Sequence, residues 1–236
     1  MYESNEKLAW KAWEPVVWGA LLISILISSQ HVGLYAYHAV LQRPGATFDG
    51  VVIDGNSMAF ATFCSMITIF FTIKFILYIK KTSFLGAFQP SIPNRKAAYD
   101  WLVVSLLFWA GLNIVSKLVG KSTTNEFILD VYNSSGFVTT LMVSVIFVAP
   151  VVEEMIFRGV ILNGLENNLV SFAKAAVITS FLFTILHQQY DWFELMWVFI
   201  FGLILAEAKR STGGILVPIG MHSLFNTASF ISIATN

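Results

Sequence analysis

Residues 136–165 read GFVTTLMVSVIFVAPVVEEMIFRGVILNGL, an apolar run long enough to cross a bilayer that carries Glu153, Glu154 and Arg158 in its interior. A helix needs about 20 apolar residues to span the hydrocarbon, and only helices or closed barrels satisfy their backbone hydrogen bonds there. Because the run is continuous, we interpret it as a transmembrane helix. A charged side chain at that depth costs at least ~2.5 kcal/mol on insertion scales, so each of the three requires a partner or a function.

The rest of the chain repeats this hydrophobic pattern. Of its 236 residues, 56% are hydrophobic and 12% are charged, whereas a soluble domain carries about 25% charged residues. No Gly/Ser-rich or Pro-rich linker separates independent blocks. We therefore predict an all-α fold, a polytopic transmembrane helix bundle of about seven spans with a four-helix catalytic core. The predicted spans are roughly Pro15 to Val40, Ser57 to Ile79, Tyr99 to Val119, Gly136 to Leu165, Phe172 to His187, Trp192 to Ala208 and Ile215 to Ile233.

Lysine and arginine residues are distributed unevenly between the two sides of such a bundle. Most fall on the side that carries the N-terminus, which by the positive-inside rule is the cytoplasm. With a formal net charge of zero and no long basic tract, the chain is not expected to bind nucleic acid. The N-terminal segment has no small-residue cleavage site and is not expected to be a removed signal peptide. The segment QPSIPNR, residues 89–95, is expected to be a cytoplasmic loop because of its two prolines.

Helical spacing predicts the roles of the three charged residues in the fourth span. Glu154 and Arg158 are four residues apart and share a helix face, so we expect them to pair. This pair alone could serve only to join helices. Glu153 is rotated by about 100° from Glu154 and must face a wet cavity, meet a partner from another helix or be protonated. A carboxylate so placed is a candidate general base. Pro150 is expected to kink the helix and leave a carbonyl unpaired, which helps to open a cavity.

Two further polar sets lie in the predicted spans that follow. His187 ends the run FLFTILH, with Phe183 one turn earlier as a packing support, and His222 and Asn226 are four apart in GGILVPIGMHSLFN. Taken singly, His187 also fits an interfacial residue, and the other pair fits an interhelical hydrogen bond. A rise of about 1.5 Å per residue places His222 and Glu153 at similar depths and His187 deeper. We therefore expect the connection over residues 188–191 to be buried.

Together these residues form three ordered motifs. They are E-E-x-x-x-R at Glu153 to Arg158, F-x-x-x-H at Phe183 to His187, and H-x-x-x-N at His222 to Asn226. In this order, within one apolar region, the pattern resembles the CPBP family. These membrane proteins, also called Abi or CAAX-protease-and-bacteriocin-processing proteins, include the prenyl-protein endopeptidases of the CAAX type. The resemblance covers roughly Phe137 to Ile233.

The resemblance implies an intramembrane endopeptidase that needs no cofactor. Residues 136–236 are then a CPBP-like catalytic core and residues 1–135 accessory transmembrane helices. The implied catalytic residues are Glu153, His187, His222 and Asn226. The first two activate water, the last two steady the oxyanion of the tetrahedral intermediate, and the Glu154–Arg158 pair has a supporting role. The expected partners are membrane lipids and a peptide or membrane-protein substrate, and the expected location is a bacterial cell membrane.

Three other functions fit part of the pattern. A zinc protease could use His187, His222 and Glu153 as ligands, although the chain lacks an H-E-x-x-H helix. The single cysteine, Cys64, excludes a Cys-based zinc site. A non-catalytic immunity or scaffold protein that binds a bacteriocin or another partner in the membrane is also compatible with the resemblance. A proton-coupled transporter uses buried carboxylates and histidines too, but it does not explain the order of the motifs. We favour the metal-free endopeptidase.

Overall fold

The computed structural model describes residues 11, 13–41, 53–83, 87–88, 94–122 and 125–235. Within these ranges every regular element is a helix, which confirms the predicted all-α fold. The polar segment before Lys11 and residues 89–93 of the QPSIPNR segment lie outside the described residues. The expectations for those two segments therefore stay predictions.

All seven predicted spans are helical in the described part of the chain. Six of them are α1 (Glu14–Val40), α2 (Gly55–Ile79), α4 (Arg95–Leu118), α9 (Phe172–Ile185), α10 (Trp192–Thr212) and α11 (Leu216–Ala234). The other is one broken helix made of α6 (Val138–Val143), η1 (Ser144–Val148), α7 (Ala149–Glu154), η2 (Met155–Leu162) and α8 (Asn163–Asn168). A short helix, α5 (Glu126–Asn133), was not predicted.

Five helices among the described residues are long and apolar enough to cross a membrane, namely α1, α2, α4, α11 and the broken helix. This protein is therefore an integral membrane protein. The remaining two predicted spans differ from these five. Helix α9 has only 14 residues, and α10 carries charged residues at both ends, including Glu194 and Arg210.

Polar residues fix where several helices begin and end. An Asx side chain accepts hydrogen bonds from the first free backbone N–H groups of a helix and so stabilises its start. Asp54, Asn94, Asn125 and Asp191 do this for α2, α4, α5 and α10. Gly213 ends α10 with a φ of 77°, a left-handed conformation that glycine adopts without steric cost.

The broken helix contains two π-helical segments, and the first explains the effect of Pro150. In η1 the N–H of Ala149 donates to the carbonyl of Ser144, five residues back. The same register would pair the carbonyl of Val145 with residue 150, which is proline and has no N–H. The predicted unpaired carbonyl is therefore that of Val145. It faces α11.

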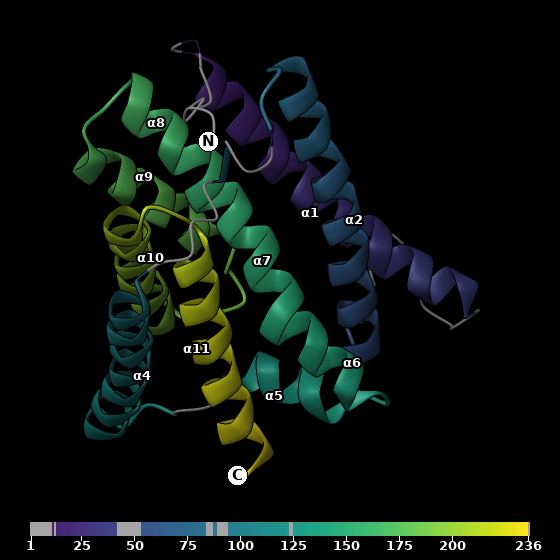
Figure 1. The fold of residues 1–236 in the computed structure, drawn as a ribbon. Helices are drawn as coiled ribbons and strands as arrows, with labels where there is room; N and C mark the ends of the chain where they lie inside the picture. The colour runs from purple at the N-terminus through teal and green to yellow at the C-terminus, as the bar shows by residue number, and fades with distance from the viewer. Residues whose placement is uncertain are drawn as a thin grey trace.

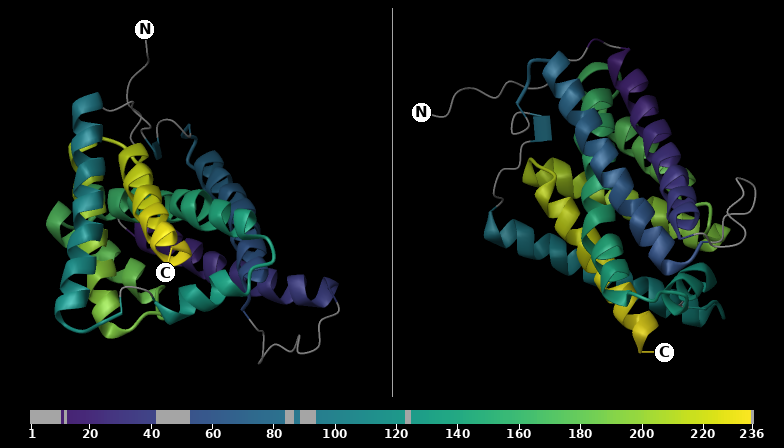
Figure 2. Two further views of the ribbon diagram at one scale, coloured as in Figure 1. Left: turned by 90° about the horizontal axis from the view of Figure 1, so that it is seen from below. Right: turned by 90° about the vertical axis from the view of Figure 1, so that its right-hand side faces the viewer.

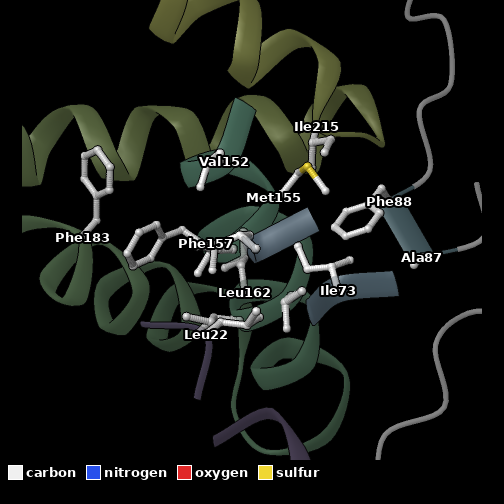
Figure 3. Packing of buried hydrophobic residues seen from close by; sticks show 14 of the residues in the cluster. Leu22, Ile73, Ala87, Phe88, Val152, Met155, Phe157, Leu162, Phe183 and Ile215 are labelled. Atoms are coloured by element: carbon white, nitrogen blue, oxygen red, sulfur yellow. The ribbon is translucent and has the colours of Figure 1, made fainter. Parts of the chain in front are cut away.

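The broken helix runs through the centre of the bundle (Figure 1). Helices α1 and α2 lie side by side on one flank, and α9, α10 and α11 lie on the other, with α4 outside α10 and α11 (Figures 1 and 2). The largest buried cluster lies around η2, where Phe157 packs beside Phe183 and Met155 lies near Phe88 (Figure 3). A Cβ added at Gly159 would come within 2.4 Å of the Phe88 ring, so this close contact requires glycine.

Charged residues pair at the two ends of the bundle. At the α8 end, Lys80, which follows α2, pairs with Glu14 of α1, and Lys209 of α10 contacts Asn163 and lies 3.9 Å from Glu166. At the opposite end, Lys121 pairs with Asp191 at 2.6 Å. Between the two ends, the broken helix carries the buried ion pair of Glu154 and Arg158 within an otherwise largely apolar layer. Which side of the membrane the α8 end faces stays a prediction.

Candidate active site

The predicted pair of Glu154 and Arg158 is present and fully buried. Arg158 Nη1 donates to Glu154 Oε1 at 2.9 Å, and neither side chain is exposed. Arg158 Nη2 donates to the carbonyl of Gly202 at 3.0 Å, and the guanidinium lies 4.8 Å from the centre of the Phe183 ring. A Cβ at Gly202 would lie 2.9 Å from Ser180 Cβ, so glycine lets α10 approach α9 closely. Arginine thus joins the broken helix to both α9 and α10.

The imidazole of His222 lies between two carboxylates. Its Nδ1 is 3.1 Å from Glu154 Oε1, and its Nε2 is 3.8 Å from Glu153 Oε2. A carboxylate paired with a guanidinium only accepts hydrogen bonds, so Nδ1 of His222 is the donor to Glu154. The supporting pair predicted from the sequence therefore orients His222 directly. A connected chain of contacts leads from buried Arg158 through Glu154 and His222 to Glu153.

His187 is oriented by the carbonyl of Phe183 at the end of α9. Its Nδ1 lies 2.8 Å from that carbonyl oxygen. A carbonyl only accepts, so Nδ1 carries the hydrogen, and in the neutral ring Nε2 presents a lone pair. The Phe183 ring also packs against His187 at 4.5 Å and His222 at 5.8 Å between ring centres. The predicted packing role of Phe183 is confirmed, and it extends to both histidines.

Asn226 is held by the carbonyl that Pro150 leaves unpaired. Its Nδ2 donates to the carbonyl of Val145 at 2.9 Å. This bond satisfies the orphaned acceptor in η1 and fixes α11 against the broken helix. One amide hydrogen and the amide oxygen of Asn226 are left for other partners.

Two cavities meet at these residues. The first, the Glu153 cavity, measures about 280 Å³ and lies among α1, α2, α5, α7 and the end of α9. The second, the aromatic cavity, measures about 180 Å³ and lies among α4, α5, α9, α10 and α11. Their shared wall consists of Ile128, Val145, His187, Tyr190, His222 and Asn226. Glu153 lines only the Glu153 cavity, whereas His187, His222 and Asn226 line both cavities. These three residues therefore lie between Glu153 and the aromatic cavity.

The connection after His187 differs from the prediction. We expected residues 188–191 to be buried, but Gln188, Gln189 and Asp191 are exposed and Tyr190 is half-buried. The depth argument placed the end of this short span deep in the bundle. In the structure α9 ends at Ile185, and the connection that follows leads to Asp191, which pairs with Lys121 after α4 at the end of the bundle. The prediction of a buried turn was therefore wrong. His187 still reaches both cavities because its ring turns inward.

The donor groups at the site bear on the zinc alternative. Among the residues that the structure describes, no group of three His, Cys, Asp or Glu side chains is arranged to hold a metal ion. Nδ1 of His187 and Nδ1 of His222 each already have a protein partner. Only Nε2 of each ring is therefore left as a nitrogen that could bind a metal ion. Independence from metal stays a prediction.

Comparison with known proteins gives a family match over the second half of the chain. Residues 135–228 match the family model described as type II CAAX prenyl endopeptidase Rce1-like. This match confirms the resemblance drawn from the three motifs. A curated Escherichia coli relative, described as an uncharacterized 24.3 kDa protein, is 28% identical over 133 residues. The alignment covers 54% of this chain and 61% of that relative, less than two thirds of its length. No solved structure matches the chain.

Proposed function

We propose that this protein is an intramembrane endopeptidase in which Glu153 is the general base. The observation that carries the proposal is the contrast between the two adjacent glutamates. Glu154 is fully buried and paired with Arg158, whereas Glu153 keeps 20% of its side chain exposed, lines a cavity and lies beside His222. One carboxylate is committed to structure, and the other is free to accept a proton. The Rce1-like match supports the same activity.

In the proposed reaction, a water molecule in the Glu153 cavity attacks the carbonyl carbon of a peptide bond. Glu153 accepts one proton of the water as its oxygen bonds to carbon, and Nε2 of His187 accepts a hydrogen bond from the other. The proton on Glu153 then passes to the amide nitrogen as the C–N bond breaks. The products are a new carboxyl group and a new amine, so atoms and charge balance.

The developing oxyanion needs preorganised hydrogen-bond donors. Asn226 offers its remaining amide N–H, and its position is fixed by the bond to Val145. His222 would act as a second donor through Nε2–H in its imidazolium form, with Nδ1–H bonded to Glu154. The same residues that form the wall between the cavities thus act on the substrate carbonyl.

The two cavities support a division between water and peptide. A peptide segment seated in the aromatic cavity would bring its scissile carbonyl to His222 and Asn226, where the two cavities meet and water beside Glu153 can reach it. The Escherichia coli relative supports a bacterial cell membrane as the location. The excess of Lys and Arg at the N-terminal side supports a cytoplasmic N-terminus. The proposed substrate is a peptide or a membrane protein.

Comparative membrane proteomics tests this proposal in cells. Strains carrying the wild type, Glu153→Gln or Glu207→Gln are compared for peptide termini. Glu207 is a matched control because it lies on the exposed side of α10, paired with Arg210. We expect an uncut precursor to accumulate only with Glu153→Gln. Identical termini in all three strains, with full biological activity of Glu153→Gln, would instead support a non-catalytic immunity or scaffold protein.

A further inference from the structure

The aromatic cavity is lined by a carboxylate that the proposed reaction does not use. Aromatic rings from α4, α10 and α11 form much of its wall, namely Trp109, Trp197, Phe201, Phe225 and Phe230. Glu194, in the first turn of α10, lines the same cavity together with Asn125. An apolar chamber that holds a single carboxylate is a distinctive chemical environment.

The contacts of Glu194 use only one of its two oxygens. Oε2 accepts from Asn125 Nδ2 at 2.6 Å and from the backbone N–H of Asp191 at 3.0 Å. Among the described residues, no hydrogen bond reaches Oε1 and no cationic side chain pairs with Glu194, because Lys121 pairs with Asp191 instead. Helix capping explains the bond from Asp191, and the bond from Asn125 joins the start of α5 to the start of α10. Neither bond explains why the Glu194 carboxylate lines the aromatic cavity with no cationic side chain paired to it among the described residues.

A second observation at the same cavity also points to a ligand. The indole nitrogen of Trp197 is buried and has no hydrogen-bond partner among the described residues, although Trp197 lines the cavity. A buried N–H without an acceptor costs about 1–3 kcal/mol by general measurements, so such groups are usually satisfied. Because this nitrogen is buried, a carbonyl oxygen of a bound peptide would provide the missing acceptor once the indole ring turns toward the cavity.

We propose that the aromatic cavity binds a lysine or arginine side chain of the peptide substrate, with its cationic group at Glu194. The aliphatic stem of the basic residue packs on the aromatic rings, which also attract cations through their faces. Oε1 of Glu194 completes the ion pair, and Trp197 donates to a main-chain carbonyl of the peptide. The inference rests on the proposed function, since His187, His222 and Asn226 line the same cavity and would then act on a nearby peptide bond.

Cleavage of a defined peptide library by the full-length protein in proteoliposomes tests this specificity. We expect enrichment of Lys and Arg at one fixed position relative to the cleaved bond. Glu194→Gln keeps an acceptor for the α10 cap but removes the charge. It should slow cleavage of Lys peptides roughly tenfold, in keeping with a cation–π contact and a partly buried ion pair, and leave matched norleucine peptides unchanged. Glu194→Lys should shift the preference to Glu, and Glu207→Gln should behave as the wild type.

The outcomes separate this inference from the proposed function. Cleavage without a basic preference, or with a preference that survives Glu194→Gln, overturns the inference alone. If the wild type cleaves none of the peptides, the proposed function fails, and binding decides the inference. In that case, fluorescence anisotropy compares dye-labelled Lys and norleucine peptides on wild type and Glu194→Gln. Tighter binding of the Lys peptide that depends on Glu194 supports the subsite, and equal binding overturns it.

Discussion

Substituting Arg158 with methionine removes one partner of the buried ion pair while roughly keeping the volume of the side chain. Three interactions of the guanidinium are lost: the bond to Glu154, the bond to the Gly202 carbonyl and the contact with the Phe183 ring. The larger effect is on the residue left behind, because Glu154 has no exposed side-chain surface. Removing one partner of a buried pair costs about 3–5 kcal/mol. We expect the free energy of unfolding to fall by about that amount.

Reversible unfolding in mixed detergent and SDS micelles, followed by circular dichroism, measures this change. The matched control is the double variant Arg158→Met with Glu154→Gln, which removes both charges. Because replacing a whole buried pair is often close to neutral, the double variant should recover most of the lost stability. A single variant within about 1 kcal/mol of the wild type, the upper value for an exposed pair, would refute the buried-pair argument. So would a double variant no more stable than the single one.

Four further predictions follow from individual contacts. Asn226→Leu leaves the Val145 carbonyl without its donor and should lower stability by about 1–3 kcal/mol as well as activity; unchanged unfolding curves would contradict this role. Gly202→Val forces α10 away from α9. It should lower the thermal unfolding midpoint more than the exposed α10 substitution Glu207→Gln does. The hydrogen bond from Lys121 lowers the pKa of Asp191 below its ordinary value of 3.8. The ionised carboxylate therefore stabilises the folded protein fully above pH 3.8, and this contribution is lost as the pH falls through the lowered pKa. Asp191→Asn keeps the helix cap, and its small stability deficit against wild type should therefore vanish in acid. Exhaustive chelation should leave peptide hydrolysis unchanged, whereas activity lost on chelation and restored by zinc would favour the zinc alternative.

The helix positions were predictable because the hydrophobic runs are bounded by residues that start or stop helices, such as the capping Asp191 and the glycine Gly213. Helix α10 begins at Trp192, as predicted, since Asp191 caps it, and α9 begins at Phe172 as predicted. Helix α5 was missed because a helix of eight residues carries too little periodicity to recognise without its neighbours. The π segments were missed as well, since a shift of one residue in hydrogen-bond register leaves no trace in hydropathy.

The site was predictable only within each helix. Spacing placed Glu154 and Arg158 on one face, and the structure shows them paired. It did not indicate that His222 lies between Glu153 and Glu154, or that Asn226 serves the carbonyl of η1, because those contacts depend on how the helices pack. Pro150 was the one available signal for the second contact, since it predicted an unpaired acceptor nearby.

The most direct test of the account is the rate of peptide-bond hydrolysis by purified Glu153→Gln protein in proteoliposomes. New peptide termini are quantified by mass spectrometry, with Glu207→Gln as the control and thermal unfolding as the check on folding. Because a positioned general base contributes about 10²–10⁴ in rate, we predict a loss of at least a hundredfold with an unchanged unfolding midpoint. Hydrolysis by Glu153→Gln at the wild-type rate would contradict the assignment of Glu153 as the base.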